Sequence, residues 1–172
     1  MFDLINGLPI HPLVVHAVVV LLPLAVLGTI AIAVRPAWRA RYGVIVTAVA
    51  LLAVLFIPVA TSSGESLQAR VGDPGQHAEL GDQLIWFAIP LLACAAALTW
   101  FGRLTQQATD ATSRKAAPGK GPTMTVAVVA VVVALATTVQ VYRVGDSGAR
   151  AAWGDQVASS SSATQSHGDS DD

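Results

Sequence analysis

The sequence predicts an all-α integral membrane protein, a four-helix bundle embedded in lipid, and two observations carry this prediction. Charged residues make up 12% of the 172-residue chain, about half of what a soluble domain carries, and the mean hydropathy is +0.60. Four stretches contain no Asp, Glu, Lys or Arg: residues 13–34, 43–60, 84–101 and 124–141. Together these features exclude an ordinary water-soluble domain and a disordered chain.

Each of these stretches is long enough to cross a bilayer as a helix. They hold 22, 18, 18 and 18 residues, and an 18-residue helix reaches about 27 Å, close to the thickness of the hydrocarbon core. Because lipid offers no hydrogen-bond partners, a helix is expected even where valine dominates. We therefore expect a membrane domain over residues 1–155 and a disordered, Ser-rich acidic tail over residues 156–172.

The basic residues predict how the chain is oriented in the membrane. The loops after the first and third stretches carry seven of the ten Lys and Arg residues. By the positive-inside rule these loops face the cytoplasm, so both termini lie on the outer side of a bacterial cytoplasmic membrane. The seven residues are Arg35, Arg39, Arg41, Arg103, Arg114, Lys115 and Lys120.

Charge and cysteine content exclude several other classes of protein. The formal net charge of -1 gives no basic excess for nucleic acid, so the lipid bilayer is the expected surrounding partner. The single cysteine, Cys94, lies inside an apolar stretch. A disulfide framework and a thiolate zinc site are therefore excluded.

The expected topology gathers polar residues at the outer end of the bundle. His11 and His16 lie at the start of the first stretch, and His77 precedes the third, which begins at the same end. Other polar residues are expected at this level: Ser63, Glu65, Glu79, Asp146 and Arg150. The sequence therefore predicts an outward-facing histidine cluster.

Several interpretations of the histidines stay open. His16 stands one turn into the first helix, and an ionisable residue inside a span is a functional-site hypothesis by default. It is expected to bond a neighbouring helix, to bind haem or a metal, or to handle protons. His11 is read as a helix-capping turn residue and His77 as a surface residue at a helix entry, with ligand roles as the alternatives.

The cofactor hypotheses follow from helix geometry. In a regular helix His11 and His16 are separated by about 7.5 Å of rise and 140° of rotation, so each would pair with His77 rather than with the other. Haem b held between His16 and His77 is one such pairing. A zinc or copper site that includes Glu65 or Glu79 is another.

The run Gly145-Asp146-Ser147-Gly148 resembles the nucleophile segment of chymotrypsin-type serine proteases. The chain lacks the soluble β-barrel on which such a triad is assembled, so this activity is excluded. We expect instead a turn that ends the fourth helix, in which the glycines take positive φ and Asp146 caps a short following segment.

Small residues predict where two of the helices approach their neighbours. Ala25, Thr29 and Ala33 recur every four residues in the first stretch. Ala130, Ala134 and Thr138 do the same in the fourth. Such stripes let membrane helices pack closely.

Four segments of the sequence carry a family resemblance: residues 8–16 (LPIHPLVVH), 63–67 (SGESL), 77–82 (HAELGD) and 143–150 (RVGDSGAR), the last with Trp153. The chain resembles bacterial four-span membrane proteins of domain of unknown function 2231. Some members of that family are joined to Rieske or cytochrome c modules, which implies a redox association. Many members carry a histidine where this chain has Asp146, and its absence weakens a metal site here.

The sequence therefore predicts a small membrane protein that acts as a structural or partner-binding component and has no catalytic activity of its own. The alternative is a haem- or metal-binding electron-transfer subunit. The partner would be a membrane redox protein or a second copy of the chain.

Overall fold

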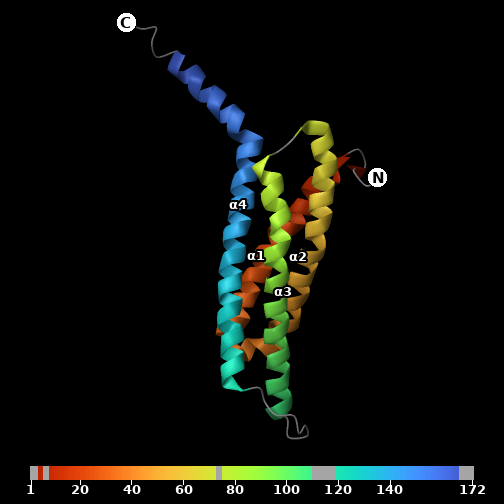
Figure 1. Ribbon diagram of the computed structural model, residues 1–172, viewed down its shortest axis with the longest axis vertical. Helices are drawn as coiled ribbons and strands as arrows, with labels where there is room; N and C mark the ends of the chain where they lie inside the picture. The colour runs from red at the N-terminus through yellow and green to blue at the C-terminus, as the bar shows by residue number, and fades with distance from the viewer. Residues whose placement is uncertain (1–3, 6–7, 73–74, 110–118, 167–172) are drawn as a thin grey trace.

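The computed structural model describes residues 4–5, 8–72, 75–109 and 119–166. In these ranges the chain forms helices α1 (Ile10–Val34), α2 (Pro36–Val71), α3 (Gln76–Thr109) and α4 (Lys120–Ser166). Two short strands precede them, β1 (Leu4–Ile5) and β2 (Leu8–Pro9), which pair antiparallel with Leu4 opposite Pro9. The fold is therefore a helical bundle with a minute N-terminal hairpin (Figure 1).

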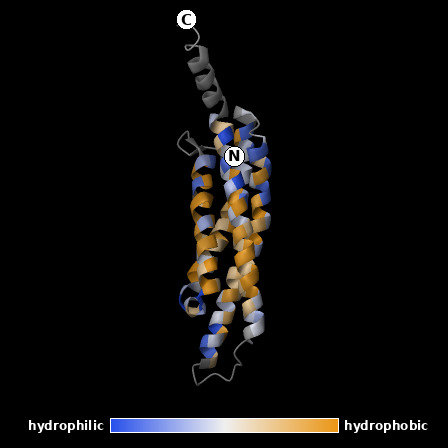
Figure 2. Ribbon diagram, turned by 90° about the vertical axis from the view of Figure 1, so that its left-hand side faces the viewer, coloured by the Kyte–Doolittle hydropathy of each residue, from blue (hydrophilic) through white to orange (hydrophobic). Residues whose placement is uncertain are grey.

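Within the described residues, all four helices are long and apolar enough to cross a membrane. Their candidate spans are Ile10–Val34, Pro36–Gln68, Gln76–Ala108 and Gly121–Trp153, with mean hydropathies of 2.8, 2.7, 2.1 and 2.3 over the most apolar windows. Figure 2 shows the hydrophobic residues in a continuous central belt, with hydrophilic residues concentrated towards the two ends. The predicted multi-pass membrane bundle is confirmed, and lipid is the environment of its outer surface.

The helices pack in chain order around the bundle. Contacts join α1 to α2, α2 to α3 and α3 to α4, and α4 closes against α1. The bend between α1 and α2 is sharp because only Arg35 separates them, and Pro36 then occupies the first helical position that proline favours. We name the two ends by their residues: the arginine end holds Arg35, Arg39, Arg41 and Arg103, and the histidine end holds His11 and His77.

The core depends on small residues, as expected where lipid supplies no hydrophobic drive between helices. Ala25 and Thr29 of α1 are fully buried, and Ala33 is nearly so, which confirms the first small-residue stripe. In α4 Ala130 and Ala134 are fully buried. The α4 stripe then continues through Thr137, whereas Thr138 is exposed, because the next buried position lies three residues on rather than four.

The structure corrects two expectations about where helices end. Helices α2 and α3 extend well beyond the uncharged stretches 43–60 and 84–101, since α2 continues to Val71 and α3 already begins at Gln76. The turn expected at residues 145–148 is also wrong, since α4 runs through it without a break, and positive φ occurs only at Gly72 and Gly75 among the described glycines. The polar residues beyond each span have adequate helix propensity, so the helices continue past the membrane boundary.

Helix α4 extends into the residues expected to form the tail. The backbone of α4 is helical to Ser166, although disorder was expected from residue 156. No glycine or proline occurs between residues 155 and 166 to end the helix. Residues 167–172 lie outside the described part of the chain, and the division into a membrane domain and a tail at residue 155 stays a prediction.

The orientation of the bundle is tested with single cysteines in a Cys94→Ala background. Glu65 and Gln107 are both exposed, Glu65 near the histidine end and Gln107 near the arginine end. We expect a membrane-impermeant thiol reagent to label Glu65→Cys in intact cells, and Gln107→Cys only after the cells are opened. The reverse pattern would place the arginine end outside.

Candidate functional site

At the histidine end, His11 ties the first turn of α1 to α2. Its Nδ1 atom lies 3.0 Å from the main-chain oxygen of Ala60 and 3.2 Å from Oγ of Ser63. A carbonyl oxygen can only accept, so Nδ1 carries the proton and donates it. The Ser63 hydroxyl in turn donates to the same Ala60 oxygen at 2.9 Å, which leaves its own lone pairs facing the imidazole.

His77 makes the same contact between α3 and α4. Its Nδ1 donates to the main-chain oxygen of Val144 at 3.1 Å and lies 3.4 Å from Oγ of Ser147. The Ser147 hydroxyl donates to that Val144 oxygen at 2.9 Å. Both histidines are half-buried, and Ser147 is buried.

A glycine makes room for each imidazole. A Cβ atom on Gly64 would lie 2.9 Å from Cε1 of His11, and one on Gly148 would lie 2.9 Å from Cε1 of His77. Neither distance is compatible with a side chain unless the ring moves away from its hydrogen bonds. These glycines therefore serve close approach between helices, not a turn.

We call each arrangement a histidine clasp. Clasp 1 consists of His11, Ala60, Ser63 and Gly64, and clasp 2 consists of His77, Val144, Ser147 and Gly148. In both, the histidine lies in the first two residues of the first helix of a hairpin. The second helix offers a carbonyl, a serine three residues later and then a glycine. The α1–α2 and α3–α4 hairpins are thus closed by equivalent contacts at the same end.

A buried amide reinforces the α3–α4 hairpin one turn deeper. Gln140 is 1% exposed, and its Nε2 donates to the main-chain oxygen of Leu80 at 3.0 Å. Thr137 is fully buried and donates to Val133 within its own helix at 2.8 Å. A buried polar group without a partner is costly in a lipid-embedded core, and both bonds remove that cost. The Gln140 bond also joins α4 to α3.

His16 is placed differently from the other two histidines. It is exposed on the outer surface of α1, and its Nδ1 donates to the main-chain oxygen of Pro12 in the same helix. With the proton on Nδ1, the Nε2 atom of the neutral ring carries a lone pair. The structure thus assigns His11 and His77 to interhelical contacts and leaves His16 on the exposed face of the bundle.

The other expected site residues fall into three groups. Ser63 belongs to clasp 1, as described above. Glu65 and Glu79 are exposed. Asp146 and Arg150 form an ion pair, with Nη2 of Arg150 2.9 Å from Oδ2 of Asp146. This pair is one helical turn apart and largely exposed, so it contributes little to stability.

Several residues of the clasps are absent from the set expected from sequence. Gly64, Gly148 and Ser147 were not among the candidate site residues, although Ser147 and Gly148 lie in the run read as a turn. The shared order of serine followed by glycine in the second helix of each hairpin was the signal that could have found them. This serine–glycine order is only two residues long, so it cannot be recognised as a signal until the histidine contacts are known.

The described residues do not bring together a metal-binding group of three or more His, Cys, Asp or Glu side chains. Nδ1 of His77 is engaged with α4, while His16 lies on the exposed face of α1. No contact among these residues joins His16 to His77, and the haem b site between them stays a prediction.

The fold and the two clasps define a class of protein, a multi-pass helical membrane bundle closed at one end by histidines. A family described as "Predicted membrane protein (DUF2231)" matches the chain over residues 7–161. The chain belongs to this family, which confirms the resemblance seen in the sequence. No curated protein and no solved structure matches it.

The clasps are tested by glycine substitution. Gly148→Ala pushes the His77 ring off the Val144 oxygen, whereas a Cβ atom on Gly145 meets nothing within 4 Å. Gly145→Ala gains helix stability, and Gly148→Ala loses a hydrogen bond against the same gain. We expect Gly148→Ala to have a free energy of unfolding about 1–2 kcal/mol below that of Gly145→Ala, measured by denaturant titration in detergent.

The same comparison applies to clasp 1. Gly64→Ala should fall below Gly81→Ala, because Gly81 also has open space around its Cβ position. Equal stability within both pairs would show that the histidine contacts contribute nothing.

Proposed function

We propose that this protein is a partner-binding component of the bacterial cytoplasmic membrane, in which the clasped bundle is a scaffold and the face of α1 around His16 is the docking surface. The partner is another membrane-spanning chain that offers a hydrogen-bond donor at the depth of His16. The observation that carries the proposal is an exposed imidazole on an otherwise apolar helix surface.

The chemistry of His16 favours a protein partner over lipid alone. Its neighbours on the exposed side of α1 are Leu13, Val19 and Val20, which are 67%, 57% and 64% exposed. A ring nitrogen with an unused lone pair is costly beside hydrocarbon, so a donor from a neighbouring helix lowers the free energy there. The bond to Pro12 holds the ring and sets its tautomer, which leaves Nε2 as the acceptor.

The two clasps support the scaffold part of the proposal. The Nδ1–H groups of His11 and His77 donate to main-chain oxygens of the neighbouring helix. These hydrogen bonds hold the two helices of each hairpin together. Because the bundle is then rigid, the face of α1 around His16 has a fixed geometry.

A second candidate function rests on the same residue. Histidines that bind a metal usually donate their other ring N–H to a carbonyl or carboxylate, and His16 makes such a bond to Pro12. Haem or a metal ion held between Nε2 of His16 and a ligand of the partner would make the protein an electron-transfer subunit. The partner is then a membrane redox protein or a second copy of this chain.

Site-specific photo-crosslinking in native membranes tests the docking surface. A benzophenone amino acid replaces Val20 in one variant and Val139 in the control. Val20 lies one turn beyond His16 on the exposed side of α1, whereas Val139 of α4 is 59% exposed and lies within the same half of the bundle. We expect a discrete crosslinked species from position 20 and none from position 139. Mass spectrometry then reports whether the captured chain spans the membrane.

The outcomes separate the candidates. Crosslinks that are equally diffuse at both positions would refute the docking surface. If the complex purified in mild detergent shows a split haem band after reduction, and His16→Ala removes the band but leaves the complex intact, the electron-transfer function replaces the simple docking role.

A further inference from the structure

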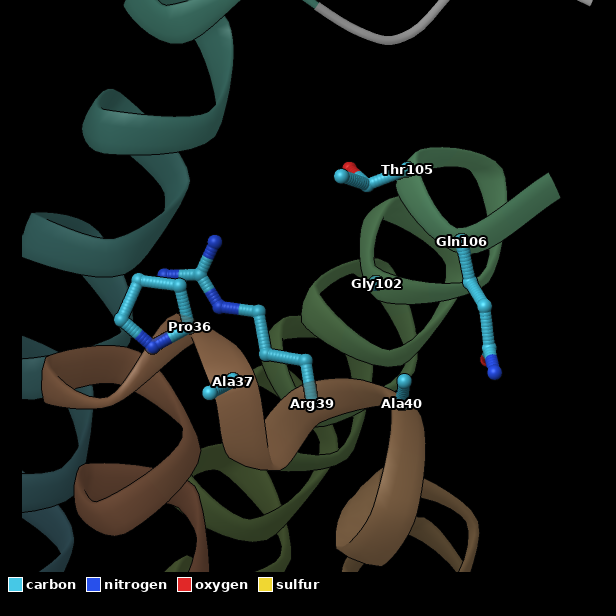
Figure 3. Close-up of a pocket in the computed structure, with 7 residues that line it drawn as sticks. All are labelled: Pro36, Ala37, Arg39, Ala40, Gly102, Thr105 and Gln106. Carbon is cyan, nitrogen blue, oxygen red and sulfur yellow. The ribbon is translucent and has the colours of Figure 1, made fainter. Parts of the chain in front are cut away.

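A pocket of about 190 Å³ opens at the arginine end, between the start of α2 and the last turns of α3 (Figure 3). On the same measure one water molecule needs about 10–15 Å³, so the pocket has room for a group larger than a few waters. Residues from the two helices line it: Pro36, Ala37, Arg39, Ala40, Gly102, Thr105 and Gln106.

Arg39 is the charged residue of this lining, and it is 5% exposed. Its Nε donates to the Ile32 oxygen at 2.8 Å and its Nη2 donates to the Ala33 oxygen at 2.9 Å. These bonds cap the last turn of α1 and use two of the five N–H donors of the guanidinium. Helix-end carbonyls supply only about half of a negative charge, so about half of the positive charge is left without a counter-charge.

The described part of the chain offers Arg39 no carboxylate. The acidic side chains that the structure describes are Glu65, Glu79, Asp82 and Asp146, and all of them lie towards the histidine end. A cation that is buried without a full counter-charge is costly, and an anion that enters the pocket would remove that cost.

The surroundings of the pocket add further positive potential. Exposed arginines at positions 35, 41 and 103 are each next in sequence to a lining residue. The guanidinium of Arg35 lies 5.1 Å from the ring of Trp38, and that of Arg41 lies 5.4 Å from the ring of Tyr42. Such stacked arginines beside interfacial aromatic residues sit at the depth of lipid headgroups.

The pocket also lies at the N-terminus of α2. Arg35 occupies the N-cap position and makes no side-chain capping bond. Pro36 has no N–H group and the Trp38 N–H donates to the Arg35 oxygen at 2.9 Å. The first turn of α2 carries no acidic side chain, so the positive end of its dipole keeps no counter-charge there. Figure 3 shows Arg39 reaching up over the start of α2 and Thr105 of α3 pointing towards the same open space.

From this geometry we propose that the pocket binds a phosphate group, held by Arg39 and the start of α2, and that its source is the headgroup of an anionic phospholipid in the leaflet at the arginine end. The exposed apolar side chains of α2 and α3 that lie between the pocket and the middle of the bilayer, among them Val44, Ile45 and Trp100, accommodate the acyl chains. Basic pockets between membrane helices are the usual setting for such headgroups.

The test measures the thermal stability of the full chain in neutral detergent, with phosphatidylglycerol, phosphatidylcholine or inorganic phosphate added. Ala37→Glu places a carboxylate in the lining, where it neutralises Arg39 and also suits the first turn of α2. We expect phosphatidylglycerol to raise the melting temperature of the wild type by about 5 °C or more, and that of Ala37→Glu by less than about 1 °C.

Two control variants separate charge from bulk and from general surface charge. Ala37→Gln adds similar bulk without charge, and it should keep at least half of the wild-type shift. Gln107→Glu makes the same change in net charge at an exposed position outside the lining, and it should keep all of it.

Equal shifts in the wild type and Ala37→Glu would overturn the site. An equal shift with phosphatidylcholine would overturn the requirement for an anionic headgroup. If inorganic phosphate alone gives the full shift, the lipid source is refuted and the pocket is a site for free phosphate.

Discussion

The structure depends on one kind of contact, an imidazole N–H that donates across a hairpin to a main-chain oxygen of the facing helix. In a bundle whose helices are apolar on nearly every side, dispersion between small residues brings helices together but does not fix their register. A single directional hydrogen bond at the end of each hairpin does fix it. His11 supplies this bond for α1 and α2, and His77 supplies it for α3 and α4.

The two ends of the bundle differ in how their polar and charged side chains are partnered. At the histidine end, the imidazoles bond to serines and main-chain oxygens, and Arg150 pairs with Asp146, so these polar groups find their partners within the protein. At the arginine end, Arg39 is buried against helix-end carbonyls alone. The histidine end therefore stabilises the fold, whereas the arginine end has a positive charge that an anion from outside the protein would neutralise. His16 belongs neither to the clasps nor to the surroundings of Arg39, because it lies on the exposed face of α1.

The sequence predicted the four helices well, because long uncharged stretches are strong signals in a membrane protein. It also placed His11 and His77 at one end. It did not reveal their partners, since a glycine such as Gly148 indicates either a turn or a close approach, and only the position of His77 decides between them. Nor could it orient His16, because a helix that is apolar on all sides gives no hydrophobic periodicity from which to read its buried face. The sequence also did not show where the helices end, because the polar residues after each span still favour helix and carry no stop signal.

The most direct measurement of the central claim compares the unfolding of His77→Ala, His77→Asn and His16→Ala in detergent. The side-chain nitrogen of asparagine occupies the place of imidazole Nδ1, so it preserves the donor of the clasp. We expect His77→Ala to lose about 1–2 kcal/mol of unfolding free energy, His77→Asn to retain most of the wild-type stability, and His16→Ala to be neutral. A His77→Ala protein as stable as the wild type, or an asparagine variant no better than alanine, would contradict it.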